Sequence, residues 1–167
     1  MKGYKVFYHD LTCRPNPEIR FQYEVGKTYK MTEPPVICQR GFHFWEFPHD
    51  VFSLHTPSFD ARVCEVEATG KIVSDGLKRG AKYATNRITI VRELHPAEIV
   101  DAMAASAFVD CFMLDIARQV RLYLNLGGIF MLTGYDRVSD LSVKQRAFVC
   151  DRAREWKDVL EAKGYEV

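Results

Sequence analysis

The residue types that could do chemistry gather in one stretch of thirteen residues, from Cys38 to Asp50. Four aromatic rings, two histidines, an arginine and two acids share this stretch, which one glycine and one proline interrupt. A segment that only packs in a core rarely carries so many polar groups among its rings, whereas a pocket for a planar, charged ligand needs both. The composition of the stretch therefore predicts a ligand-binding site in this part of the chain.

Alternation along an extended strand would decide which side chains of this stretch face the site. Phe42 and Phe44 would share one strand face, and His43 and Trp45 the other. If the phenylalanines are buried, His43 points to solvent or into a cleft, while Trp45 is either a stacking surface beside it or a core residue. We expect His43, Trp45 and the earlier His9 to open into one cavity lined by a sheet.

Basic side chains outside the stretch extend the candidate site. Arginine holds phosphate groups by paired hydrogen bonds, so Arg14, Arg40 and Arg87 are candidate ligands for an anion. The alternatives are a solvated loop for the basic residues and, for His9, a strand-end histidine bonded to a nearby carbonyl. No catalytic residue is assigned. The predicted ligand-binding residues are His9, Arg14, Arg40, Phe42, His43, Trp45 and Arg87.

Two histidine–cysteine pairs raise the alternative of a metal site. His9 with Cys13, and Cys38 with His43, could supply the nitrogen and sulfur ligands of tetrahedral zinc. Their spacings match no common zinc finger or ribbon, and the thiols can equally be small buried apolar groups. The prediction is therefore a protein without a metal.

The composition is that of an ordinary globular protein, and its net charge does not favour a charged partner of either sign. Its 167 residues fit one domain, or one domain with a helical appendage, and 47% of them are apolar. The formal net charge is +1, so nucleic acid is not the expected partner. Five cysteines without a Cys-x-x-Cys pair are typical of reduced thiols, and neither a signal peptide nor a membrane span is apparent. We expect a soluble, cytoplasmic protein.

Up to residue 94 the sequence predicts a β-rich region. Arg62–Ala68 alternates apolar with polar residues and is the clearest half-buried strand. Pro48 is well placed at the first turn of a short helix, where its missing N–H costs nothing. The other predicted extended segments are Tyr4–His9, Val36–Cys38, Gly41–Trp45, Lys71–Val73 and Arg87–Val91.

Turn signals separate these strands. Gly26 and Lys27 predict a hairpin between residues 19–25 and 28–31. Prolines predict a loop at Thr12–Pro17, and polar residues with glycine predict another at Ser74–Lys82.

Beyond residue 94, helical periodicity replaces alternation. Pro96 opens a first helix, and Val109–Leu126 forms a second with its apolar residues on one side. Ser142 and Gln145 make a capping box that begins a third helix, which runs to about Lys163. We therefore predict an α+β chain: a bent, mainly antiparallel sheet in a β-rich domain of residues 1–94, then three helices in residues 95–167 packed on or beside it.

Three blocks of the β-rich part resemble a family of small, uncharacterised proteins common in phages and bacterial genomes. The blocks are Asp10–Arg14 leading into Phe21–Tyr29, Cys38-x-x-Gly41-Phe42-His43 with Pro48-x-Asp50-Val51, and Cys64–Gly70. The resemblance covers roughly the first 95 residues. It implies a phage-type protein of the host cytoplasm and brings no known activity with it.

A second resemblance concerns the fold of ADP-ribosyltransferases of the His-Tyr-Glu type. Tyr8-His9-Asp10-Leu11-Thr12 is similar to the Tyr-His-Gly-Thr strand of that family, and Gly41-Phe42-His43-Phe44 to its Gly-aromatic-x-Phe strand. The resemblance implies that His9 holds the ribose of NAD and that Phe42 or Phe44 stacks on nicotinamide. The family's glutamate at the opening of a late strand has no counterpart, because Asn86-Arg87-Ile88 stands there.

Two functions remain open from the sequence. The favoured one is a phage-type accessory protein, in an anti-defence role, that binds a host or bacterial defence-system protein and acts by occupancy. The dense apolar segment 127–132 could supply part of its contact surface. The alternative is an NAD- or nucleotide-binding protein related to ADP-ribosyltransferases and catalytically degenerate. The sequence leaves open whether the protein is an enzyme, and we favour a protein that does not catalyse a reaction.

Overall fold

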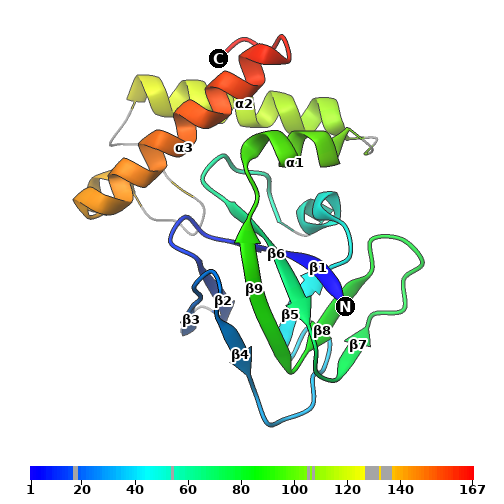
Figure 1. Cartoon of the computed structure of the whole chain (residues 1–167). Helices are drawn as coiled ribbons and strands as arrows, with labels where there is room; N and C mark the ends of the chain where they lie inside the picture. The colour runs from blue at the N-terminus through cyan, green and yellow to red at the C-terminus, as the bar shows by residue number, and fades with distance from the viewer. Residues whose placement is uncertain (17–18, 54, 105, 107, 127–131, 133–136) are drawn as a thin grey trace. The chain divides into compact units, whose positions relative to one another are not determined.

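The structure is a computed structural model of the whole chain, and it describes all residues except 17–18, 54, 105, 107, 127–131 and 133–136 (Figure 1). The chain divides into two compact units. One holds Met1–Phe7, Leu11–Thr56 and Arg62–Leu94, and the other holds Tyr8–Asp10, Pro57–Ala61 and His95–Val167. The second unit therefore takes two short segments from the N-terminal part of the chain in addition to the helical region.

An antiparallel sheet of seven strands forms most of the first unit. Its order is β4-β9-β6-β1-β5-β8-β7, so the first strand in the sequence lies at the centre (Figure 1). Every neighbouring pair runs antiparallel, which confirms the prediction of an α+β chain with a mainly antiparallel sheet before the helices. The strands are β1 (Lys2–Phe7), β4 (Thr28–Lys30), β5 (Phe42–Trp45), β6 (Arg62–Ala68), β7 (Ile72–Ser74), β8 (Lys82–Thr85) and β9 (Arg87–Glu93).

One face of this sheet carries the hydrophobic core of the unit. Phe7, Val66 and Ile90 from three adjacent strands are buried there with Phe44 of β5. Gly3 makes the close approach of β5 possible, because a Cβ at this position would lie 2.5 Å from a ring carbon of Phe44. The core therefore depends on alternation in long central strands, with one glycine where a ring crosses the backbone.

One strand forms where the prolines predicted a loop. β2 (Thr12–Asn16) pairs with β3 (Ile19–Gln22) in a separate two-stranded sheet (Figure 1). The loop prediction for Thr12–Pro17 is therefore wrong. A strand with a single neighbour does not need every backbone N–H for its ladder, so it tolerates a proline, and the register shifts between Cys13 and Asn16.

The predicted hairpin around Gly26 and Lys27 is also wrong in its pairing. β3 pairs with β2, whereas β4 pairs with β9 of the large sheet. The turn itself is bonded to β9: Gly26 N–H donates to the carbonyl of Ile90 at 2.7 Å, and Ile90 N–H donates to the carbonyl of Lys27 at 3.0 Å. Hydrogen bonds to a strand much later in the sequence, which a local pattern does not contain, decide the partners.

The segment predicted as a strand at Val36–Cys38 is a tight turn. The N–H groups of Gln39 and Arg40 donate to the carbonyl of Val36 at 3.1 and 2.9 Å, and Cys38 takes a left-handed backbone conformation with φ of 60°. Local bonds back to Val36 replace the ladder that a strand would need. The turn leads directly into β5.

Two further boundaries bear on the candidate site. β1 ends at Phe7, before the predicted end at His9, so His9 lies in a turn after the strand. β5 lies within the segment predicted to be extended, and the 3₁₀ helix η1 (Pro48–Ser53) begins at the predicted proline.

Three helices make up most of the second unit: α1 (Pro96–Met103), α2 (Val109–Leu126) and α3 (Val143–Ala162), with a short 3₁₀ helix, η3 (Val138–Asp140), between the last two. The predicted capping box is confirmed at α3, where the Ser142 side chain accepts from Gln145 N–H and Gln145 accepts from Ser142 N–H. No helix in the described parts of the chain is long and apolar enough to cross a membrane. The predicted contact surface at 127–132 lies, except for Leu132, outside the described residues.

Candidate ligand-binding site

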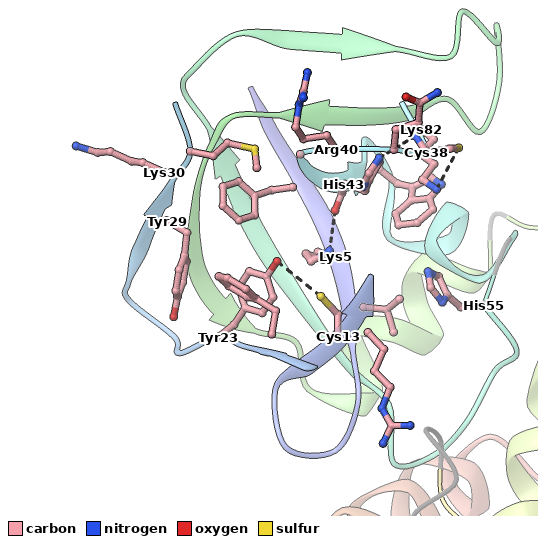
Figure 2. Close-up of a pocket in the computed structure, with 18 residues that line it drawn as sticks. Lys5, Cys13, Tyr23, Tyr29, Lys30, Cys38, Arg40, His43, His55 and Lys82 are labelled. Atoms are coloured by element: carbon pink, nitrogen blue, oxygen red, sulfur yellow. Dashed lines mark hydrogen bonds between the residues drawn. The ribbon is translucent and has the colours of Figure 1, made fainter. Parts of the chain in front are cut away.

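The β-rich unit contains a cavity of about 540 Å³, a volume that suits a small organic ligand (Figure 2). Its walls come from β1, β2, β3, β4, β5 and β8, and from the turn that precedes β5. Segments far apart in the sequence therefore meet at this cavity, which lies within one unit of the chain.

Aromatic rings form one end of the cavity. Phe21, Tyr23, Tyr29 and Phe42 line it, and their ring centroids lie 4.7 Å (Phe21–Tyr23), 5.0 Å (Tyr23–Tyr29) and 6.4 Å (Tyr29–Phe42) apart. All of these pairs are tilted or edge-on, the arrangements that aromatic side chains prefer. The rings hold one another and leave an apolar wall against which a planar group can pack.

Polar and basic groups form the other end. The Cys38 N–H donates to Nε2 of His43 at 3.0 Å, which makes Nε2 the unprotonated ring nitrogen. Lys82 Nζ lies 5.7 Å from the ring centroid of the buried Trp45 and 3.8 Å from the Cys38 sulfur. The pairing of β5 with β8 and the sharp turn before β5 thus bring a cation, an imidazole and an indole together. Figure 2 shows Lys82, His43 and Cys38 of this end.

Lys5 lies between the two ends, as Figure 2 shows. It belongs to the central strand β1, is 7% exposed and lines the cavity. Its Nζ donates to the carbonyl oxygen of His43 at 3.0 Å and lies 5.6 Å from the ring centroid of Tyr23. One buried ammonium group therefore contacts both halves of the site.

The cavity carries a one-sided charge. Among the described residues that line it, five are basic and none is acidic. The basic residues are Lys5, Arg14, Lys30, Arg40 and Lys82. Such a lining favours an anionic ligand over a neutral or cationic one.

The positive charge changes the ionisation of the groups beside it. Burial lowers the pKa of His43 to about 4, and the ammonium groups of Lys82 and Lys5 contribute to this effect. The pKa of His55 is lowered by the same causes, but its side chain is more than a third exposed, so solvent screens the effect. Burial and the neighbouring Cys13 raise the pKa of Tyr23. At neutral pH the His43 imidazole is therefore neutral and the charge of the site resides on lysine and arginine.

The structure brings together five of the seven side chains predicted to bind a ligand. Arg14, Arg40, Phe42, His43 and Trp45 all line the cavity. Trp45 is buried, as a core tryptophan would be, and still contributes to the wall.

The other two predicted residues are not among the described residues that line the cavity. His9 is buried in the turn after β1 and groups with the second unit. Arg87 is exposed at the start of β9. We expected His9, His43 and Trp45 to share one cavity. His43 and Trp45 are among the described residues that line it, and His9 is not. In the described parts of the chain, no group of three or more His, Cys, Asp or Glu residues is arranged to hold a metal ion.

Sequence reasoning missed Lys5, Tyr23, Tyr29 and Lys82. All of them lie outside the Cys38–Asp50 stretch. Tyr29 and Lys82 reach the cavity through the pairing of β4 with β9 and of β8 with β5, and Tyr23 is held by the hydrogen bond of its N–H to the carbonyl of Leu11. Lys5 did leave a signal, because it stands two positions before Phe7 and so shares its strand face. A lysine on the buried face of a strand is unusual enough to mark a functional candidate.

The fold and the cavity together define an α+β domain with a pocket of ligand size. A family model described as a domain of unknown function (DUF7666) matches residues 1–102, and the chain belongs to this family. This confirms the predicted membership in an uncharacterised family. No curated protein and no solved structure matches the chain.

Proposed function

We propose that the protein binds an anion of the nucleotide class, in which a planar base is joined to phosphate groups, in the cavity of the β-rich unit. NAD and ADP-ribose are the first candidates. The observation that carries this proposal is the lining: five basic side chains and a cluster of aromatic rings, with no acidic residue among the described lining residues. Aromatic rings stack on a base whatever its identity, and basic groups hold phosphates. As part of the same proposal, the protein is related to ADP-ribosyltransferases and is located in the cytoplasm.

Arg40 is the side chain best arranged for a phosphate. Its Nε donates to the carbonyl of Pro34 at 2.9 Å, which orients the guanidinium group. That bond leaves the two terminal nitrogens for a ligand, and paired N–H donors match the geometry of two phosphate oxygens. Lys82 adds a point charge near Trp45.

The test is calorimetric titration with ADP-ribose and NAD, with adenosine as a ligand that keeps the base and ribose but lacks phosphate. Arg40→Gln should weaken ADP-ribose binding about tenfold or more, since a hydrogen bond to a charged group contributes roughly 1.5–3 kcal/mol. Arg87→Gln is the matched control, because Arg87 is not a lining residue, and it should bind as the wild type does. Equal losses in both variants, or no binding of either nucleotide at millimolar concentration, would contradict the proposal.

The role that the resemblance implies for His9 has its own test. If His9 holds the ribose of NAD, His9→Ala should weaken NAD binding as strongly as Arg40→Gln does. If the lining residues alone form the site, the affinity of a folded His9→Ala variant stays unchanged. A melting curve of the variant provides the folding control.

Binding of a protein partner is a second candidate function, favoured by exposed apolar residues on α2. Leu114, Leu122 and Leu126 are 60%, 37% and 49% exposed and recur at helical spacing. A strip of this kind on a described helix face can form a contact surface. It fits the predicted accessory role of a phage-type protein that occupies a host or bacterial defence-system protein.

This second function is tested by quantitative capture of host proteins on the tagged protein. The double substitution Leu114→Ser with Leu122→Ser should remove a captured partner, whereas Val91→Ser, at a similarly exposed position on β9, should retain it. A partner that binds all three proteins equally would show that the α2 strip is not the contact surface.

A further inference from the structure

Lys5 occupies a position where a lysine is energetically costly. It lies on the central strand β1, shares a strand face with Phe7, and is 7% exposed. Burying an ammonium group away from water is unfavourable unless a carboxylate or several acceptors compensate. Among the described residues, no carboxylate pairs with Lys5; its hydrogen bond is to the carbonyl oxygen of His43.

The surroundings of Lys5 favour the neutral form of its amine, whereas the surroundings of a lysine on the protein surface favour the charged form. Its Nζ lies 5.5 and 5.6 Å from the ring centroids of Phe7 and Tyr23, which supply an apolar environment. Burial lowers the pKa of Lys5; Lys82 adds to this effect, while Cys13 and Cys64 oppose it. A buried lysine of this kind can act as a nucleophile, because the unprotonated amine is the reactive form.

The amine is also accessible from the cavity, since Lys5 is one of its lining residues. We propose that Lys5 is a nucleophilic amine that binds a small, planar aldehyde or ketone carrying a negative charge, as a Schiff base. The inference rests on the proposed function for the anionic character of the ligand and adds a covalent step to it.

The step balances without any further reagent. The lone pair of Lys5 Nζ attacks the carbonyl carbon and forms a carbon–nitrogen bond, giving a carbinolamine. The two hydrogens of the neutral amine then leave with the carbonyl oxygen as one water molecule, and a carbon–nitrogen double bond remains. No atom is oxidised or reduced. The aromatic end of the cavity can pack against the ring of the ligand, and Lys82 can hold its charge.

The experiment uses the full-length protein and pyridoxal 5′-phosphate as probe, because this molecule combines a planar ring, an aldehyde and a phosphate. Borohydride reduction converts a Schiff base into a stable secondary amine, and peptide mass mapping then locates the label. We expect the label on Lys5 and its loss in Lys5→Met. Lys71→Met is the matched control, since Lys71 is exposed and is not among the described residues that line the cavity, and it should keep the label on Lys5.

Label on exposed lysines such as Lys30 or Lys71, with Lys5 unmodified, overturns the inference. Should Lys5→Met fail to fold, the wild-type peptide map gives the same decision by itself. Binding of ADP-ribose without any label on Lys5 refutes the covalent step and leaves the proposed function standing. Label on Lys5 in a protein that binds neither ADP-ribose nor NAD refutes the nucleotide proposal and supports the nucleophilic lysine.

Discussion

The two ends of the cavity are built in different ways, although β5 contributes to both. At the aromatic end, Tyr23, Tyr29 and Phe42 are held by one another, with ring centroids 5.0 to 6.4 Å apart. At the basic end, His43 and Lys82 are placed by a backbone hydrogen bond and by a cation over a ring. Packing therefore determines the shape of one end, whereas burial and the neighbouring lysines determine the protonation of the other. Substitutions should change stability at the first end and ionisation at the second.

The largest effect is expected at the aromatic end. Phe42 is 7% exposed and its ring lies 6.2 to 6.4 Å from three other rings of the cluster. Phe42→Ala should lower the free energy of unfolding by roughly 3–5 kcal/mol, because it removes buried surface and leaves a void. Denaturation in urea measures the change. Phe21→Ala, at a ring that is 37% exposed, is the control and should cost clearly less. Equal losses would contradict the expectation that burial of the ring determines the cost.

The next effect is a dependence of stability on acid pH at the basic end. The folded pKa of His43 is about 4, below the ordinary value of 6.5, so in that window the unfolded chain binds a proton that the folded protein does not. The contribution of His43 to the free energy of unfolding is therefore fully present above pH 6.5. It is lost as the pH drops towards 4, and the free energy of unfolding falls by about 1–3 kcal/mol in all. His43→Gln keeps an acceptor for the Cys38 N–H but cannot titrate, and should flatten this part of the profile.

Unfolding free energies measured across that pH window check this prediction. Leu77→Ser provides the comparison, since Leu77 is exposed and does not titrate, and it should leave the acid slope as in the wild type. An unchanged slope in His43→Gln would mean that other groups cause the loss of stability in acid.

The helices and the sheet differ in how far the sequence predicts them. α2 has the predicted bounds and α3 begins at its predicted capping box, because these signals lie within a few residues of the helix ends. β6 also has its predicted bounds, since its alternation is strict. Strand partners were not predictable: the pairing of β4 with β9 depends on residues far along the chain, which no local pattern contains.

The candidate site shows the same division. Arg40, Phe42, His43 and Trp45 were found because they share one short segment, and the turn and strand there bring them together. Tyr23 and Lys82 were missed because only the assembled sheet places them beside that segment. Local composition thus located one wall of the cavity, whereas its charge balance required the three-dimensional structure.

The smallest effect is expected for a substitution that separates the two causes of the lowered pKa of His43, which are burial and the charge of the neighbouring lysines. Lys82→Met removes a cation and keeps an unbranched side chain near the ring of Trp45, so stability should change by less than about 1 kcal/mol. The pKa of His43 should rise from about 4 but stay below 6.5, because burial is the larger cause and remains. An NMR titration of the imidazole measures this change. Lys71→Met, at an exposed lysine, should leave the pKa of His43 where it is; a rise of equal size there would mean that overall charge, and not a lysine at the cavity, controls the protonation of this end.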